Sequence, residues 1–271
     1  MKTILLIGAG GGMGSACARL FCKNGDRVIG IDRAEMQMPD EVIPIHADLA
    51  DPEQIAAAFE TAVRLVQSID AVVYAAGIYD ADSLVEIDDA RMKRIFDVNL
   101  FGAYRILHAF LPLLKHGARI VFVTSELADL DPLPFTGLYG ITKATLDRFA
   151  FSLAMELQML GMRVSVLRPG AVKTVLLNQS VDRIKSFTEG TKLYPGVAAK
   201  FLSVTNRVEA KAIPPARVAK KITSILSKKR PRFQYSLNRN PLLRLYGILP
   251  KQVKLFIIRT YLKSNKKGTV D

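Results

Sequence analysis

Residues 8–14 read GAGGGMG, with five glycines in seven positions. The apolar residues 3–7 before it predict a buried strand, and residues 13–23 after it place apolar side chains at helical spacing. Glycine permits positive φ and a close approach of the backbone to a ligand, while the amides and dipole at a helix start favour a pyrophosphate. This order predicts a dinucleotide-binding turn, with a merely tight connection as the alternative.

The glycine spacing is Gly-x-x-x-Gly-x-Gly, at Gly8, Gly12 and Gly14. The commoner dinucleotide spacing, Gly-x-Gly-x-x-Gly, fails because Met13 occupies the place of its third glycine. The prediction therefore depends on the position of the turn directly after the first expected strand.

Two acidic positions follow the next expected strands. Asp32 ends residues 27–32, where a carboxylate accepts hydrogen bonds from the adenosine ribose and repels a 2′-phosphate. We therefore expect NAD in preference to NADP, although Arg33 would suit that phosphate, and a turn cap is the alternative role for Asp32. Asp48-Leu49, after the third expected strand, is a candidate for holding the adenine edge.

Apolar runs alternate with helical patterns along the chain, which predicts an α/β fold. Near-continuous apolar strands between helices indicate a doubly wound parallel sheet of about seven strands with helices on both faces. The alternation loosens for about forty residues after Gly170. We expect one domain over residues 1–238 and a helical tail over 239–271. The expected strands are 3–7, 27–32, 42–46, 70–76, 118–124, 163–167 and 233–237, and the expected helices are 13–23, 52–66, 88–114, 138–160 and 215–227.

Composition excludes several protein classes. With 271 residues, 49% of them hydrophobic, the chain is not disordered. No apolar stretch is long enough for a transmembrane helix, and the start lacks a basic signal-peptide region. Cys17 and Cys22 lie in one expected helix, a poor geometry for a disulfide, so we expect a cytoplasmic protein.

The net charge of +13 belongs to the end of the chain. Residues 211–271 contain 16 Lys and Arg and one acid, a net charge of +15, whereas the other 210 residues have a net charge of −2. Such a segment suits a phospholipid surface, nucleic acid or an acidic partner, and a solvated surface is the alternative. No nucleic-acid-binding motif accompanies the charge, which argues against a nucleic-acid binder.

Tyr139 and Lys143 are four residues apart on an expected helix, so their side chains lie on one face. A nearby ammonium favours the phenolate, so we expect the pKa of Tyr139 to be lowered toward neutral pH. Ser125 ends the fifth expected strand and suits the same pocket, while Asn99 lies in the helical stretch between the fourth and fifth strands.

With these motifs in order, the sequence resembles the short-chain dehydrogenase/reductase family from Thr3 to about Thr174. The resemblance implies a Rossmann-type fold, a nicotinamide dinucleotide and no metal. The residues that support it are the glycine turn, Asp48-Leu49, Ala75-Ala76-Gly77, Asn99, Ser125, Tyr139, Lys143 and the sequence PGAVKT at 169–174.

Residue roles follow from the resemblance. Tyr139 would exchange the proton with the substrate oxygen, and Ser125 would hydrogen-bond that oxygen. Lys143 would lower the tyrosine pKa and hold the nicotinamide ribose, and Asn99 would support a water relay to it. Thr174 would contact the carboxamide or the phosphates. The residues expected at the dinucleotide are Gly8, Gly12, Met13, Gly14, Asp32, Arg33, Asp48, Leu49, Ala76, Gly77, Tyr139, Lys143, Pro169, Gly170, Val172 and Thr174.

The family places its substrate lid at about residues 175–214 of this chain, and here that segment is apolar. It suggests a hydrophobic alcohol or ketone such as a steroid, retinoid or lipid, as in the hydroxysteroid and retinol dehydrogenase branch. Packing into the core is the alternative for these side chains. A 3-oxoacyl reductase or a non-catalytic dinucleotide sensor are the rival functions. The lid residues in question are Val175, Leu176, Leu177, Phe187, Leu193, Tyr194, Phe201 and Leu202.

The tail after Asn240 mixes apolar and basic residues at helical spacing. This pattern suits a helix on an anionic membrane surface, which would make the protein peripheral to a membrane. It also suits a helix that covers the pocket or joins subunits of a dimer or tetramer, with its lysines toward water. We favour the covering or subunit role.

Overall fold

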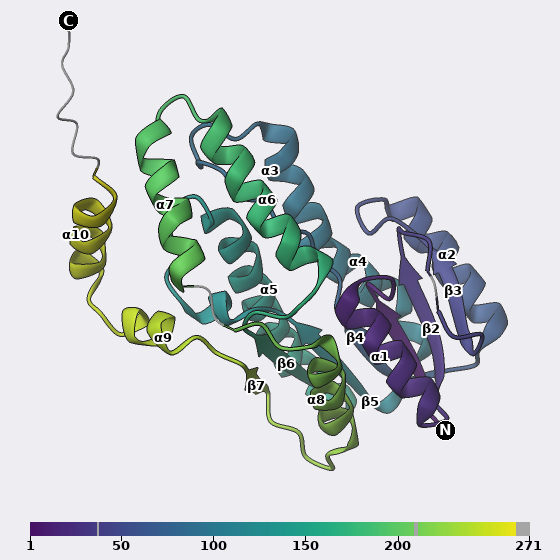
Figure 1. The fold of residues 1–271 in the computed structure, drawn as a ribbon. Coiled ribbons are helices and arrows are strands. Elements are labelled where there is room, and N and C mark those ends of the chain that lie inside the picture. Colours follow the sequence, from purple (N-terminus) through teal and green to yellow (C-terminus); the bar gives the residue numbers. More distant parts are fainter. Residues whose placement is uncertain (37, 209–210, 264–271) are drawn as a thin grey trace, which may run out of the picture.

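The computed structural model describes residues 1–36, 38–208 and 211–263, without the side chains of residues 204–208 (Figure 1). The last residues of the expected tail, 264–271, and residues 209–210 of the expected lid lie outside this description.

Seven strands form one parallel sheet in the order β3-β2-β1-β4-β5-β6-β7, as the sequence predicts. The order reverses between β1 and β4, so the carboxyl ends of these strands border a crevice suited to a ligand. The strands are β1 (Thr3–Ile7), β2 (Arg27–Asp32), β3 (Val42–His46), β4 (Ile69–Tyr74), β5 (Leu114–Val123), β6 (Arg163–Pro169) and β7 (Gln234–Leu237).

Helices cover both faces of the sheet (Figure 1). On one face lie α1 (Gly12–Lys23) and α8 (Pro215–Ser227), which bury an apolar stripe against the strands. On the other lie α2 (Pro52–Leu65), α4 (Gly102–Phe110) and α5 (Gly137–Leu157). The central strands are apolar on both sides because both faces are covered, which explains their continuous apolar runs.

Local signals set several boundaries. Asp51 caps α2, its carboxylate accepting from the backbone amides of Glu53 and Gln54, and Pro52 occupies the first helical turn. Between β4 and β5 the chain forms α3 (Asp89–Phe96), then a short π-helix over Asp97–Phe101, then α4. The expected helix over residues 88–114 is therefore helical but interrupted.

The structure corrects the expected start of the fifth strand, the expected place of Ser125 and the interpretation of the segment after Gly170. Strand β5 begins at Leu114, four residues early, and ends at Val123, so Ser125 follows the strand and caps a short 3₁₀ helix (Glu126–Asp129). The loosened segment after Gly170 contains two helices, α6 (Val175–Gly190) and α7 (Pro195–Val208). Helix α6 buries only Ile184 and Phe187, so its sequence lacks a strong apolar period.

The tail forms α9 (Pro241–Gly247) and α10 (Lys251–Leu262), at the end of the molecule away from α2 (Figure 1). Both cysteines are free thiols, as expected. Within the described part of the chain, every helix is too short or too polar to cross a bilayer.

Candidate active site

The β1–α1 turn requires its glycines. Gly8 has φ +80°, and a Cβ there would lie 2.6 Å from the backbone of Ala76 at the end of β4. A Cβ on Gly14 would lie 2.0 Å from the Gly8 carbonyl oxygen. Since no side chain fits at either position, the start of α1 packs directly on the strand ends, with its dipole toward the crevice.

A cavity of about 400 Å³ opens over this turn, and we call it the glycine-turn cavity. Asp32 lines it, with its carboxylate held by the amides of Gly10 at 2.9 Å and Ala34 at 3.0 Å. The carboxylate thus caps a turn and also faces the cavity. Predicted dinucleotide residues in the lining are Gly8, Gly12, Met13, Gly14, Asp32, Arg33, Asp48, Leu49, Ala76, Gly77 and Thr174.

Arg94 is a lining residue that the sequence did not reveal. Its guanidinium donates to the Asp48 carboxylate at 2.8 Å, and Arg33 lies 3.7 Å from the same carboxylate. Partial burial opposes ionisation of Asp48, but hydrogen bonds and the two guanidinium groups outweigh it and lower its pKa. Arg94 lies on α3, far along the chain from Asp48, and no motif marks it.

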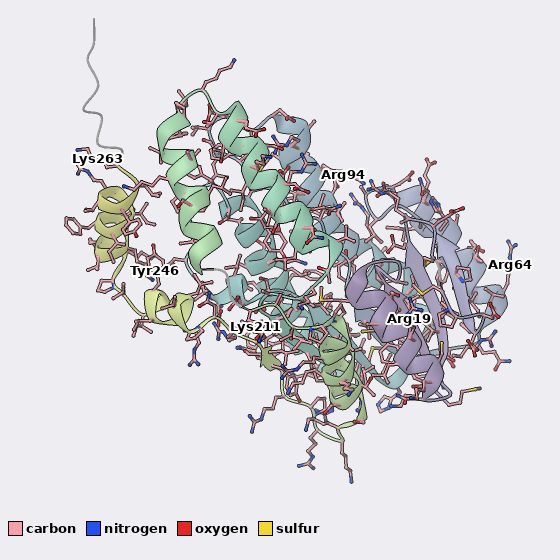
Figure 2. The ribbon with its side chains drawn as sticks, viewed as in Figure 1. Arg19, Arg64, Arg94, Lys211, Tyr246 and Lys263 are labelled. Atoms are coloured by element: carbon pink, nitrogen blue, oxygen red, sulfur yellow. The ribbon has the colours of Figure 1, made fainter. Side chains whose placement is uncertain are left out.

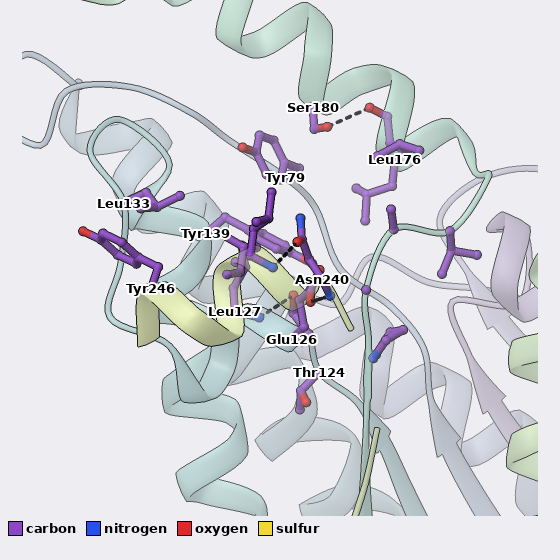
Figure 3. Close-up of a pocket in the computed structure, with 18 of the residues that line it drawn as sticks. Tyr79, Thr124, Glu126, Leu127, Leu133, Tyr139, Leu176, Ser180, Asn240 and Tyr246 are labelled. Atoms are coloured by element: carbon purple, nitrogen blue, oxygen red, sulfur yellow. Dashed lines mark hydrogen bonds between the residues drawn. The ribbon is translucent and has the colours of Figure 1, made fainter. Parts of the chain in front are cut away.

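Tyr139, Lys143 and Ser125 meet at the carboxyl end of β5, as the spacing predicts. Tyr139 and Lys143 are both buried on α5, with the Lys143 Nζ 5.7 Å from the tyrosine ring centroid. Tyr79 packs against the Tyr139 ring at 4.8 Å between centroids (Figure 3). Ser125 is hydrogen-bonded to Tyr139 and its Oγ accepts from the Leu127 amide at 3.2 Å.

The pKa values differ from the sequence expectation. Burial raises the pKa of Tyr139 to about 12, although the hydrogen bond with Ser125 opposes the rise. Burial also lowers the pKa of Lys143 to about 8. The expected lowering of the tyrosine pKa by the ammonium is therefore wrong for this structure, because loss of water around the phenol has the larger effect.

Asn99 lies in the short π-helix and is fully buried. Its amide donates to the Ile78 carbonyl and to Thr142 Oγ1, both at 3.0 Å, and accepts from the Ile78 amide at 2.8 Å. A Cβ on Gly77 would lie 2.8 Å from Lys143 Nζ and 3.3 Å from Asn99 Oδ1. Gly77 therefore brings the amide and the ammonium to one place beside the glycine-turn cavity.

A second cavity, of about 540 Å³, lies on the other side of Tyr139, and we call it the apolar cavity. Ser125 and Tyr139 line it, and Met13, Thr174 and Leu176 line both cavities. The two spaces therefore meet at these three residues, and Tyr139 lines the apolar cavity but not the glycine-turn cavity. Pro169, Gly170 and Val172, expected at the dinucleotide, line the apolar cavity instead, because the chain turns there toward α6.

The expected lid residues divide between cavity and core. Leu176, Leu177 and Phe201 line the apolar cavity. Phe187 and Tyr194 pack on the Phe135 ring, so core packing is correct for them. The remaining three differ again: Val175 lines the glycine-turn cavity, Leu193 is exposed, and Leu202 packs beside a small buried cluster.

The tail helices close the apolar cavity from outside, which agrees with the covering role. Leu243, Tyr246 and Ile258 are among their lining residues. Figure 3 shows Tyr246 and Leu133 on one side of Tyr139, and Leu176 and Ser180 on the other.

Acidic residues just after Ser125 anchor the tail, a feature that the sequence did not reveal. Buried Glu126 accepts from the Asn240 amide at 2.7 Å, and burial raises its pKa. Asp129 pairs with Arg239 of the tail at 2.7 Å. The third contact joins Asp131 to Lys254 of α10 at 2.6 Å.

Comparisons with known proteins agree with this geometry. A family model for short chain dehydrogenase matches residues 2–185. Oxidoreductase UcpA of Escherichia coli strain K12 is 31% identical over 184 residues, covering 64% of this chain and 70% of the relative. A short-chain dehydrogenase structure from Streptomyces avermitilis has a TM-score of 0.76 at 24% identity, covering 94% of each chain. The 3-ketoacyl-(acyl-carrier-protein) reductase of Brucella melitensis, solved with NADH, has a TM-score of 0.70 at 23% identity, covering 87% of this chain and 95% of that one.

Proposed function

Since the chain belongs to the short chain dehydrogenase family, we propose that it interconverts a secondary alcohol and a ketone on an apolar molecule, with NAD preferred over NADP. As a member it is an oxidoreductase that acts on CH–OH groups with NAD or NADP. One observation supports the proposal above all. The apolar cavity, which Tyr139 lines, adjoins the glycine-turn cavity at Met13, Thr174 and Leu176, so a substrate in the first would lie next to a dinucleotide in the second.

The glycine-turn cavity suits the dinucleotide on its own geometry. Gly12 and Thr174 both line it and pack against each other, since a Cβ on Gly12 would lie 2.9 Å from the threonine methyl. The amino ends of α1 and α6 lie on either side of this approach, so amides and dipoles favour a pyrophosphate. Asp32 would accept from the ribose hydroxyls and repel a 2′-phosphate.

Two side chains would contact the substrate oxygen, and two more would support them. Ser125 donates a hydrogen bond to it and Tyr139, protonated at neutral pH, transfers its proton to it during ketone reduction. The bound nicotinamide supplies the hydride for reduction or accepts it in oxidation. Lys143 holds a positive charge beside the ring and offers donors to the nicotinamide ribose, while Asn99 fixes the backbone next to it.

The substrate class rests on the lining of the apolar cavity. Its walls come mainly from leucine, isoleucine and aromatic side chains, with Ser125, Tyr139 and Glu126 among the few polar groups at the inner end. A steroid, retinoid or lipid-like ketone fits that chemistry. A 3-oxoacyl reductase is the second candidate, because the basic tail would suit an acidic carrier protein.

The exposed apolar side chains of α4 and α5 support assembly into a dimer or tetramer. Tyr104, Phe151 and Met155 are each about half exposed, and such residues at a protein surface favour contact with a second copy. The free thiols of Cys17 and Cys22 fit a reducing cytoplasm.

A substrate panel tests the proposed function. The full chain is mixed with NADH or NADPH and with steroid ketones, retinoids, acyl thioesters or sugars, and absorbance of the reduced nicotinamide is followed. We expect the apolar ketones to give a kcat/KM about 100-fold above the sugars, since each buried CH₂ contributes about 0.8 kcal/mol. Preference for the acyl thioester would favour the second candidate, and equal turnover of sugars would contradict the apolar assignment.

A further inference from the structure

The outer surface of the tail helices is apolar and exposed. Leu245, Leu255 and Phe256 are 61%, 70% and 68% exposed, and Ile248 between the helices is 78% exposed. In contrast, the inner stripe of α10, Lys254 with Leu262, is buried against the domain. The tail therefore uses one face to close the apolar cavity and leaves a second apolar face without a partner in the described chain.

Basic side chains surround this outer face, and residues 239–263 contain no Asp or Glu. Arg239 and Lys254 pair with the domain, as described above. The other four basic side chains of the segment form no ion pair within the part of the chain that the structure describes. These four are Arg244, Lys251, Arg259 and Lys263.

The outer face is continuous with the apolar cavity. Leu242, Ile257 and Tyr261 line that cavity and are also 58%, 36% and 55% exposed. An apolar lining thus runs from beside Tyr139 to the outer surface of the tail. Figure 2 shows Tyr246 and Lys263 at the end of the molecule far from Arg64, so a surface approaching the tail would not meet α2.

We propose that this outer face docks on an anionic phospholipid bilayer and opens the apolar cavity toward it. Leucine and phenylalanine side chains enter the boundary between headgroups and acyl chains, while arginine and lysine contact the lipid phosphates. A bilayer fits better than a second copy, because a second copy would bring the same uncompensated positive charges against each other. Delivery of substrate from the bilayer rests on the proposed function, whereas docking itself does not.

Vesicle sedimentation tests the docking. The full chain is mixed with vesicles of phosphatidylcholine alone or of phosphatidylcholine with phosphatidylglycerol. We expect binding to the anionic vesicles at least about tenfold tighter than to the neutral ones, and several-fold weaker at about 0.5 M salt than at about 0.1 M. Equal binding to both vesicles, or no binding to either, would overturn the proposal.

Two matched double variants locate the surface. Leu255→Ser with Phe256→Ser removes two adjacent exposed apolar side chains from α10 and should weaken binding at least about tenfold. The control, Met159→Ser with Leu160→Ser, removes an adjacent exposed pair from the short 3₁₀ helix (Gln158–Leu160) that follows α5 and should change nothing. NADH binding verifies folding of each variant. Equal loss in both variants would overturn the proposal, as would a smaller assembly in the first variant with unchanged vesicle binding, because a second copy would then cover the face.

The test separates docking from chemistry. Sedimentation needs no turnover, so the absence of any substrate from the panel would leave vesicle binding intact. Conversely, an enzyme that turns over substrate but does not bind anionic vesicles would refute docking without contradicting the proposed reaction.

Discussion

The glycine-turn cavity and the apolar cavity are built in different ways. The glycine-turn cavity is lined mainly by strand ends and one tight turn, with Asp32, whose carboxylate is held by the Gly10 amide, in the lining. The apolar cavity also has strand-end residues at its inner end, but its outer walls are side chains of α6, α7 and the tail. The first is fixed by the sheet itself, whereas the second depends on side-chain packing and on ion pairs such as Asp131 with Lys254.

This difference predicts different sensitivities. Changes at the glycine turn should strongly impair dinucleotide binding, since backbone atoms there cannot move without disturbing β1 and β4. Changes at the tail should alter substrate affinity only modestly, because each anchor is one of several. Lys143 is buried beside Gly77 of the glycine-turn cavity, and we expect its burial to lower the stability of the protein in return for function.

Lys143→Met should give the largest effect on stability. Burial lowers the lysine pKa from 10.5 to about 8, so the unfolded chain binds more protons between these values and wild-type stability rises with pH across that window. Below pH 8 the buried charge costs about 3 kcal/mol, which the variant avoids. Denaturant unfolding of the ligand-free protein should show the variant more stable at pH 7, with the gain vanishing near pH 10.5. A gain that is independent of pH, or one matched by exposed Lys185→Met, would disprove this.

Gly14→Ala should abolish most dinucleotide affinity. The new Cβ would lie 2.0 Å from the Gly8 carbonyl oxygen, and an overlap with backbone costs about 3 kcal/mol or more, or roughly 100-fold in affinity. NADH fluorescence titration measures the loss. Gly190→Ala is the control, because nothing lies within 4 Å of its added Cβ. Similar NADH affinity in both variants would place the dinucleotide elsewhere.

Asp32→Ala should change cofactor choice more than overall activity. Removing the carboxylate removes both a charged hydrogen-bond acceptor and a repulsion, so the NAD to NADP ratio of kcat/KM should fall about tenfold. Asp26→Ala, an acidic position at the opposite end of β2 and outside the cavity lining, is the comparison. An unchanged ratio would leave Asp32 as a turn cap alone.

Lys254→Met should give the smallest effect, and we expect it only on substrate binding in the apolar cavity. It keeps most of the side-chain volume but removes the contacts with Asp131 and the Gly247 carbonyl. The KM of an apolar ketone should rise about threefold while the KM of NADH stays constant, since one of three anchors is lost. Lys251→Met, at an exposed site on the same helix, should leave both unchanged. A rise in the NADH KM would mean that the two cavities are not independent.

The sequence predicted the glycine-turn cavity far better than the apolar one. Gly8, Asp32 and Tyr139 have local signatures, because strand ends and helical spacing determine where such residues lie. Arg94, Glu126 and the tail anchors have none, since their partners are distant in sequence and only the packed chain brings them together. The raised pKa of Tyr139 could not be predicted from the sequence either. The spacing reveals the neighbouring ammonium but not the loss of water around the phenol.

Tyr139→Phe tests the proposal that the Tyr139 hydroxyl exchanges a proton with a substrate in the apolar cavity. The variant keeps the ring that packs on Tyr79 but lacks the transferable proton. With the best apolar ketone and saturating NADH, the account predicts that kcat falls at least about 100-fold while the NADH dissociation constant stays unchanged. A variant that turns over within a few-fold of the wild type would contradict it.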